Sequence, residues 1–113
     1  MQNTHLIGFQ RMDAYGVAKE LAVLVHRLKI RDAELRDQAG RASKSAFLQL
    51  SEGLPNAGVA MRRKYFTCAR NSVCEVAAAV DLAIAIDAVD AALGLSVLET
   101  AARLCAMIHG LLR

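Results

Sequence analysis

The sequence contains few of the residues that interrupt helices. Proline occurs once, glycine seven times, tryptophan not at all, and only five of the 113 residues are aromatic. By contrast, 55% of the chain is hydrophobic and 21 residues are alanine, which has the highest helix propensity. This composition is unlike that of a disordered chain. It favours an all-α protein in which residues 1–113 form a single domain.

Cysteine is also scarce, and its spacing excludes several protein classes. Cys68, Cys74 and Cys105 are odd in number and have no CxxC spacing, which argues against a disulfide framework or a zinc finger. We expect three half-buried thiols in a reducing compartment. The opening MQNTHLIGF lacks the basic and apolar regions of a signal peptide. Charges such as Asp81 interrupt each apolar run before it reaches the roughly 18 residues of a membrane span. We therefore predict a cytoplasmic protein without a membrane contact.

The motifs of common enzymes and metal sites are absent. The sequence has no glycine-rich phosphate loop and no G-x-S-x-G turn. Glu52 and Glu75 could form a catalytic carboxylate pair. Structural roles account for them better, since Glu52 precedes the glycine that ends a helix and Glu75 could form an ion pair with a basic residue of the second helix. Cys105 and His109 have the spacing of two metal ligands on one helix, without a third and fourth. We expect no enzymatic activity, no cofactor and no metal.

Apolar residues recur with the period of a helix in four segments. The first has apolar residues from position 14 to 28 and Asp13 available as its N-cap, and it is predicted to end near Lys29 to Arg31. The second begins near Asp32 and stops at Gly53, which a proline follows two residues later. Gly40 lies inside this second helix at a cost of about 1 kcal/mol relative to alanine. We expect a close crossing of another backbone to compensate for it.

The third helix is predicted from the longest regular pattern. Its apolar residues repeat every seven positions between residues 59 and 86, as in a long bundle helix. Asp87 and Asp90 fit a turn directly after it, and this is the turn that we favour. Ser96 with Glu99 also fits a capping box, which would start the fourth helix later.

The fourth helix carries two adjacent apolar stripes. Such a helix either lies in the middle of the molecule or meets another subunit. Four helices with short connections predict an antiparallel up-down-up-down four-helix bundle. The first stripe consists of Val97, Ala101, Leu104, Ile108 and Leu111, and the second of Leu98, Cys105 and Leu112.

The positive balance lies in the first three quarters of the chain and is densest at residues 61–76. Fourteen Lys and Arg against eleven Asp and Glu give a net charge of +3. Clustered cations bind phosphates, because each neutralised phosphate releases counterions, although a solvated helix face has the same appearance. No RNP-type aromatic motif or helix-turn-helix signal indicates base-specific reading, and Tyr65 is the aromatic candidate for stacking on a base. The candidate nucleic-acid-binding residues are Arg41, Lys44, Arg62, Arg63, Lys64 and Arg70.

Three stretches resemble a known family. They are RASKSAFLQLSEG at residues 41–53, RRKYFTCARNSVCEVAAAVDLA at residues 62–83 and LCAMIHGLL at residues 104–112. Their pattern is similar to that of the small four-helix-bundle proteins encoded in intervening sequences of bacterial 23S rRNA genes. The same family includes the accessory variability proteins of diversity-generating retroelements. The resemblance implies a ring-shaped homopentamer and, for the accessory proteins, a reverse transcriptase as partner. The residues in matching places are Arg41, Ala42, Ser45, Glu52, Gly53, Arg63, Phe66, Ala69, Ser72 and Glu75.

Two functions are compatible with these features. We favour a small non-enzymatic cationic assembly that binds RNA or DNA without sequence specificity. The alternative is a structural or interaction module with a merely solvated basic face, which docks a protein such as a reverse transcriptase through the apolar stripe of the fourth helix. Salt distinguishes them, since it weakens phosphate contacts much more than apolar ones.

Overall fold

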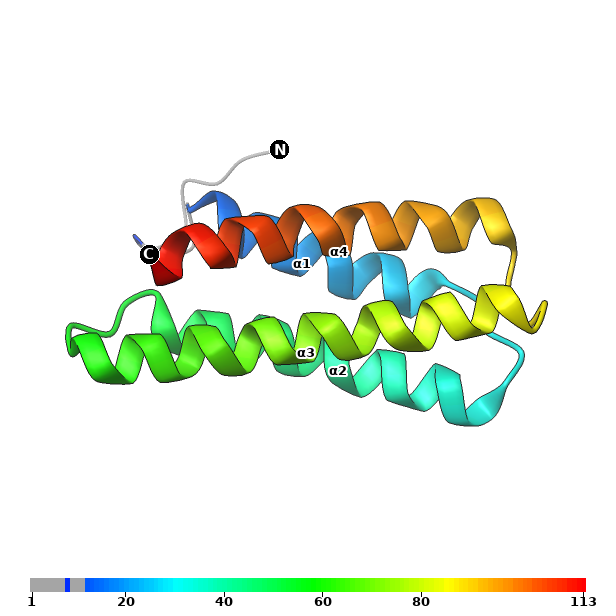
Figure 1. Ribbon diagram of the computed structural model, residues 1–113, viewed down its shortest axis with the longest axis horizontal. Coiled ribbons are helices and arrows are strands. Elements are labelled where there is room, and N and C mark those ends of the chain that lie inside the picture. Colours follow the sequence, from blue (N-terminus) through cyan, green and yellow to red (C-terminus); the bar gives the residue numbers. More distant parts are fainter. Residues whose placement is uncertain (1–7, 9–11) are drawn as a thin grey trace.

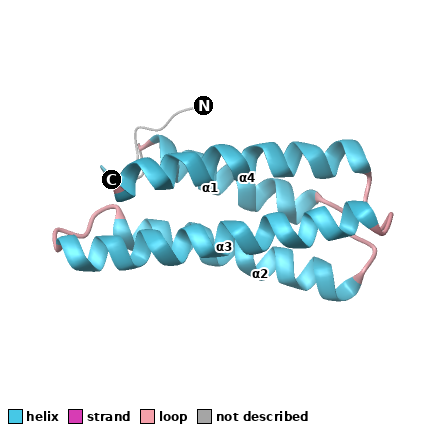
Figure 2. Cartoon of the chain, in the orientation of Figure 1, coloured by secondary structure: helices cyan, strands magenta, loops and turns pink. Residues whose placement is uncertain are grey.

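Residues 8 and 12–113 are described by a computed structural model of the chain. Four α-helices make up most of this part (Figure 1), and no strand occurs in it (Figure 2). The all-α, four-helix prediction is confirmed. The helices are α1 (Asp13–Arg27), α2 (Ala33–Gly53), α3 (Val59–Ala85) and α4 (Ala91–Leu112).

Aspartate side chains fix the starts of α2 and α4. Asp32 is the N-cap of α2 and accepts a hydrogen bond from the Leu35 N–H at 3.0 Å. Asp90 is the N-cap of α4 and accepts one from the Leu93 N–H at 2.9 Å. Each bond satisfies a donor that the first helical turn leaves free. The earlier of the two turns considered between the third and fourth helices is therefore correct, and Ser96 lies inside α4.

The N-cap predicted for α1 is wrong. Met12 occupies the cap position without a side-chain hydrogen bond, and Asp13 is the first helical residue. A carboxylate in the first turn is still favourable, because it lies at the positive end of the helix dipole. α1 ends at Arg27, before the predicted end near Lys29 to Arg31, because Leu28 has extended backbone angles (φ −73°, ψ 126°).

Each of the four helices packs against two of the others. α1 packs against α2 and α4, and α3 packs against the same two helices. The α1–α2 and α3–α4 connections lie at one end of the molecule, and the α2–α3 connection and the C-terminus lie at the other (Figure 1). Arg31 joins the first two connections, since its N–H donates to the Ala88 carbonyl at 2.7 Å and its guanidinium to the Asp87 carbonyl at 2.5 Å.

The core lies between the helices, as the apolar spacing predicts. Phe66, Ala69, Val73 and Val76 of α3 are each at most 2% exposed. The facing side of α2 buries small residues, which allow the two helices to approach closely. Near the middle of this contact, Ser72 of α3 donates a hydrogen bond to the hydroxyl of Ser45 of α2 at 3.0 Å. The buried small residues of α2 are Ala39, Ala42, Ser43, Ala46 and Gly53.

Gly40 does not mark a close helix crossing, so that prediction is wrong. A Cβ atom at Gly40 would have no atom within 4 Å outside its own helix turn and chain neighbours. The close approaches are at two other glycines. A Cβ at Gly53 would lie 2.8 Å from Cε1 of Phe66, and a Cβ at Gly94 would lie 2.9 Å from Cδ1 of Ile84.

We expect Gly40→Ala to stabilise the protein. Alanine relieves the entropic cost of a helical glycine and meets no neighbour at this position, so the free energy of unfolding should rise by about 1 kcal/mol. Denaturation by urea measures this change. Gly94→Ala is the matched control, and there the free energy should fall because Ile84 has to move. A loss of stability in Gly40→Ala would show that a backbone does pack at this glycine.

α4 differs from the expectation that no segment is long and apolar enough to span a membrane. Its 22 residues are sufficient by length and composition, even though Glu99 and Arg103 lie within it. The core helices of many water-soluble proteins meet the same criterion. Within this fold, the apolar side of α4 packs on α1 and α3, with Val97, Ala101 and Leu104 buried.

Candidate nucleic-acid interface

Most basic side chains of the described helices have no carboxylate partner. In this part of the chain the single ion pair joins Arg103 of α4 to Glu20 of α1 at 2.8 Å, and both side chains are about half exposed. Glu75, expected to pair with a basic residue, is exposed and forms no ion pair with a described residue. The charge of the unpaired cations is therefore available to an external anion.

Lys44 of α2 lies in a group of cations that spans two helices. It lines an open cavity of about 350 Å³ between α1 and α2, together with Lys19, His26 and Arg27 of α1. Arg41 is exposed one turn before Lys44 and extends the same positive area. We call Lys19, Arg27, Arg41 and Lys44 the α1/α2 basic surface. The other residues that line the cavity are apolar, namely Ala22, Val23 and Phe47.

Phe47 and Lys19, which line this cavity, each contact the ring of Tyr15. The Tyr15 and Phe47 rings pack in a tilted arrangement, with their centroids 5.0 Å apart and their planes at 49°. The ammonium of Lys19 lies 5.3 Å from the Tyr15 ring centroid, within the range of a cation–π contact. These contacts place a positive charge over the buried Tyr15 ring, which in turn packs against the half-buried Phe47.

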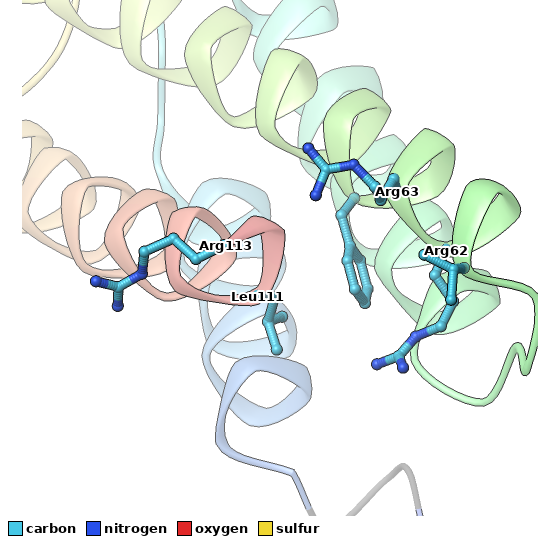
Figure 3. A pocket seen from close by; sticks show the side chains of 6 residues that line it. Arg62, Arg63, Leu111 and Arg113 are labelled. Atoms are coloured by element: carbon cyan, nitrogen blue, oxygen red, sulfur yellow. The ribbon is translucent and has the colours of Figure 1, made fainter.

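Arg62 and Arg63 line a second cavity, of about 200 Å³, between the start of α3 and the end of α4 (Figure 3). The guanidinium of Arg62 lies 5.5 Å from the Phe66 ring centroid, and its Nε is buried without a hydrogen-bond partner among the described residues. Arg63 donates to the carbonyl of Leu112 at the end of α4. Arg113 also lines the cavity, but its guanidinium points away from that of Arg62 (Figure 3).

The start of α3 is unusually positive. Its N-cap is Gly58, which provides no side-chain hydrogen bond, and its first turn has no acidic residue. Arg62, Arg63 and Lys64 follow within the first two turns. The helix dipole adds partial positive charge at the same end. Free N–H groups, the dipole and the arginines together favour a bound anion such as a phosphate.

The six residues predicted from the sequence do not form one surface. Gly53 of α2 faces Phe66 of α3, and Ser45 meets Ser72 further along. Lys44 precedes Gly53 by nine residues and Arg62 precedes Phe66 by four, in opposite directions along the bundle. At 1.5 Å per residue, the two cations are roughly 20 Å apart along the axis.

The remaining predicted residues are distributed along α3. Lys64 is exposed on its solvent face. Arg70 is half-buried and follows Arg63 by seven residues, so both lie on the side of α3 that faces α4. Tyr65, predicted to be available for stacking, is half-buried, and its Cβ lies close to Gly53.

Sequence analysis missed Lys19 and Arg27. Both belong to the α1/α2 basic surface because α1 packs against α2 beside Lys44. Their spacing contained a signal, since Lys19, Val23 and Arg27 follow one another at four-residue steps on one helix face. Val23, between the two cations, is 39% exposed.

The residues considered for other chemistry are not grouped. Glu52 and Glu75 are both exposed. No set of three or more His, Cys, Asp and Glu in the described part of the chain could hold a metal ion. The cysteines are free thiols, of which Cys68 and Cys105 are half-buried as predicted, whereas Cys74 is exposed.

The family resemblance is confirmed by a comparison with protein families. The model of the 23S rRNA-intervening sequence protein family matches residues 10–110. This region contains α1, α2 and α3 in full and all but the last two residues of α4. A comparison with curated proteins finds no match. The chain belongs to the family of 23S rRNA-intervening sequence proteins.

Proposed function

We propose that this protein is a non-enzymatic nucleic-acid-binding protein that holds RNA or DNA through phosphates without reading the base sequence. The observation that carries the proposal is the lining of the two cavities by cations. Lys19, Arg27 and Lys44 line one and Arg62 and Arg63 the other, with no Asp or Glu among the described residues that line either cavity. Each phosphate that such a cation neutralises releases a counterion, which supplies the free energy of non-specific binding.

The proposal includes a cytoplasmic antiparallel up-down-up-down bundle that assembles into a homo-oligomer, a homopentamer by family resemblance. Exposed aliphatic residues around the α3–α4 connection support an assembly, because monomers rarely expose several large apolar side chains together. A ring of subunits presents each basic surface several times, so that weak contacts add through effective concentration. These aliphatic residues are Leu82, Ile86, Leu93 and Leu95, each 50 to 58% exposed.

A matched pair of charge variants tests the proposal. Arg41→Gln with Lys44→Gln removes two unpaired cations, and we expect the affinity for a fluorescein-labelled RNA to fall at least tenfold at low salt. The control is Arg103→Gln with Lys29→Gln, which removes the same amount of charge. Arg103 belongs to the ion pair with Glu20, and Lys29 lies in the α1–α2 connection. This control should change the affinity less than threefold. Fluorescence anisotropy measures both. Equal losses would mean that only the net charge matters, and no binding by the wild type would contradict the proposal.

The competing function is docking of a protein partner, such as a reverse transcriptase, with a basic surface that is only solvated. The exposed aliphatic side chains of α3 and α4 favour it. The variants separate the two functions. A docking module would retain its partner in Arg41→Gln with Lys44→Gln and lose it in Leu95→Asp, since an apolar contact depends on burial rather than on salt.

A further inference from the structure

The cavity between α1 and α2 combines two surfaces that a simple phosphate site does not need. Three of its lining side chains are apolar, Ala22, Val23 and Phe47, and we call them the floor. Three others are cations, Lys19, Arg27 and Lys44, and we call them the rim; His26 also lines the cavity. Phosphate contacts alone would be satisfied by the cations. An apolar floor under a cationic rim is complementary to a ligand with a flat apolar body and negative charges on both sides.

We infer that this cavity takes one unpaired base of a single-stranded nucleic acid, against Phe47 and Val23, while the rim cations hold the phosphates on either side. The inference rests on the proposed function and specifies its ligand. In a duplex the bases are stacked and paired inside the helix and cannot enter such a cavity. In a single strand they are free to stack on an aromatic side chain beside a basic groove.

The dimensions agree with one nucleotide. The cavity volume of about 350 Å³ lies near the lower end of the range for small-molecule sites, roughly 300 to 1,000 Å³. Along α1, Lys19 and Arg27 are eight residues apart, or about 12 Å, with Val23 midway. One cation therefore lies on each side of the apolar floor, where the two phosphates that flank a base would pass.

The position of Phe47 also suits stacking. Tyr15 packs against Phe47 at 5.0 Å and Lys19 lies over Tyr15 at 5.3 Å, so the aromatic pair is oriented before any ligand arrives. A rigid aromatic side chain loses little conformational entropy on binding. The arginine cavity at the start of α3 has a different construction, because Phe66 there is 1% exposed and belongs to the core.

A pair of oligonucleotides with equal charge tests the inference. One is a fluorescein-labelled strand of ten thymidines, and the other is a strand of the same length in which abasic sites replace the thymidines. Because both carry the same phosphates, a difference in affinity measures the bases alone. We expect the wild type to bind the thymidine strand at least about fivefold more tightly, as for stacking of a base on an aromatic side chain.

Two variants locate the effect in the cavity. Val23→Glu places a carboxylate on the floor at a position that is 39% exposed, and Phe47→Leu removes the ring but keeps an apolar side chain. In both variants the affinities for the thymidine strand and the abasic strand should become about equal. Ala78→Glu makes the same charge change on the exposed side of α3 and should retain the preference. Circular dichroism verifies that each variant remains helical.

The outcomes distinguish the inference from the proposed function. Equal binding of the two strands by the wild type would overturn the inference and leave phosphate binding intact. A thymidine preference that survives in both Val23→Glu and Phe47→Leu would also overturn it, because the base would then stack elsewhere. Failure of the wild type to bind either strand at low salt would contradict the proposed function itself.

Discussion

Val73→Asp is expected to unfold the protein at room temperature. Val73 is 2% exposed in the middle of α3, the helix that packs against both α2 and α4. An unpaired carboxylate in this position has no cation to neutralise it among the buried residues around it, and such a charge costs several kcal/mol. A domain of this size has only about 5 to 15 kcal/mol of stability. The α-helical signal in circular dichroism should therefore be lost, or its thermal midpoint should fall by tens of degrees.

Ala78→Asp is the matched control for this substitution. Ala78 lies five residues further along α3 and is exposed, so the same new charge remains in water. Its cost is limited to the lower helix propensity of aspartate, about 0.7 kcal/mol. Similar melting temperatures for the two variants would show that Val73 does not lie in the core.

Phe66→Ala is expected to lower the free energy of unfolding by about 3 to 5 kcal/mol. Phe66 is among the largest fully buried side chains, and truncation leaves a cavity that the surrounding helices fill only in part. Urea denaturation of the wild type and the variant measures the loss. Met61→Ala, at a position 45% exposed and five residues earlier, should change stability by less than about 1 kcal/mol.

The contact between Phe66 and Gly53 makes this prediction more specific. A Cβ at Gly53 would lie 2.8 Å and 2.9 Å from two ring carbons of Phe66, closer than real Cβ atoms approach. Gly53→Ala should therefore destabilise the wild type and cost much less in the Phe66→Ala background. A double-mutant cycle measures this coupling, which for residues in contact is about 0.5 to 3 kcal/mol. Additive effects would mean that the two residues do not touch.

The sequence predicted the local features of the fold well, because they depend on neighbouring residues. Asp32 caps α2 through a contact only three residues along the chain, and α2 ends at the predicted Gly53. The regular spacing of Phe66, Val73 and Val80 predicts one buried face, and all three are buried. For the start of α4 the sequence allowed two positions, one after a turn at Asp87 and Asp90 and one at a capping box of Ser96 with Glu99. The structure selects Asp90, whose carboxylate meets the Leu93 N–H.

The predictions that failed depend on contacts between distant parts of the chain. Gly40 and Gly53 are both glycines of α2, but only Gly53 lies against another helix. Which glycine lies at a close approach is decided by the position of α3 relative to α2. Asp13 and Met12 illustrate a smaller error, since a helix can begin without a side-chain cap when packing stabilises it.

The candidate interface was predicted only in part for the same reason. The run Arg62, Arg63 and Lys64 is visible because the residues are consecutive. The sequence could not reveal that Arg63 binds the Leu112 carbonyl, 49 residues away. Nor could it place Lys19 beside Lys44, since that proximity arises from the packing of α1 on α2. Local sequence finds clusters of charge, whereas packing determines which clusters share a surface.

The measurement that tests nucleic-acid binding most directly is mass by light scattering after size exclusion, with a labelled RNA and a duplex DNA, at two salt concentrations. A protein that makes six or more phosphate contacts loses at least about 10³ in affinity between 50 and 200 mM salt. We predict an oligomer that carries nucleic acid at the lower concentration and elutes without it at the higher one. An oligomer that carries neither RNA nor DNA at either concentration would contradict the proposal.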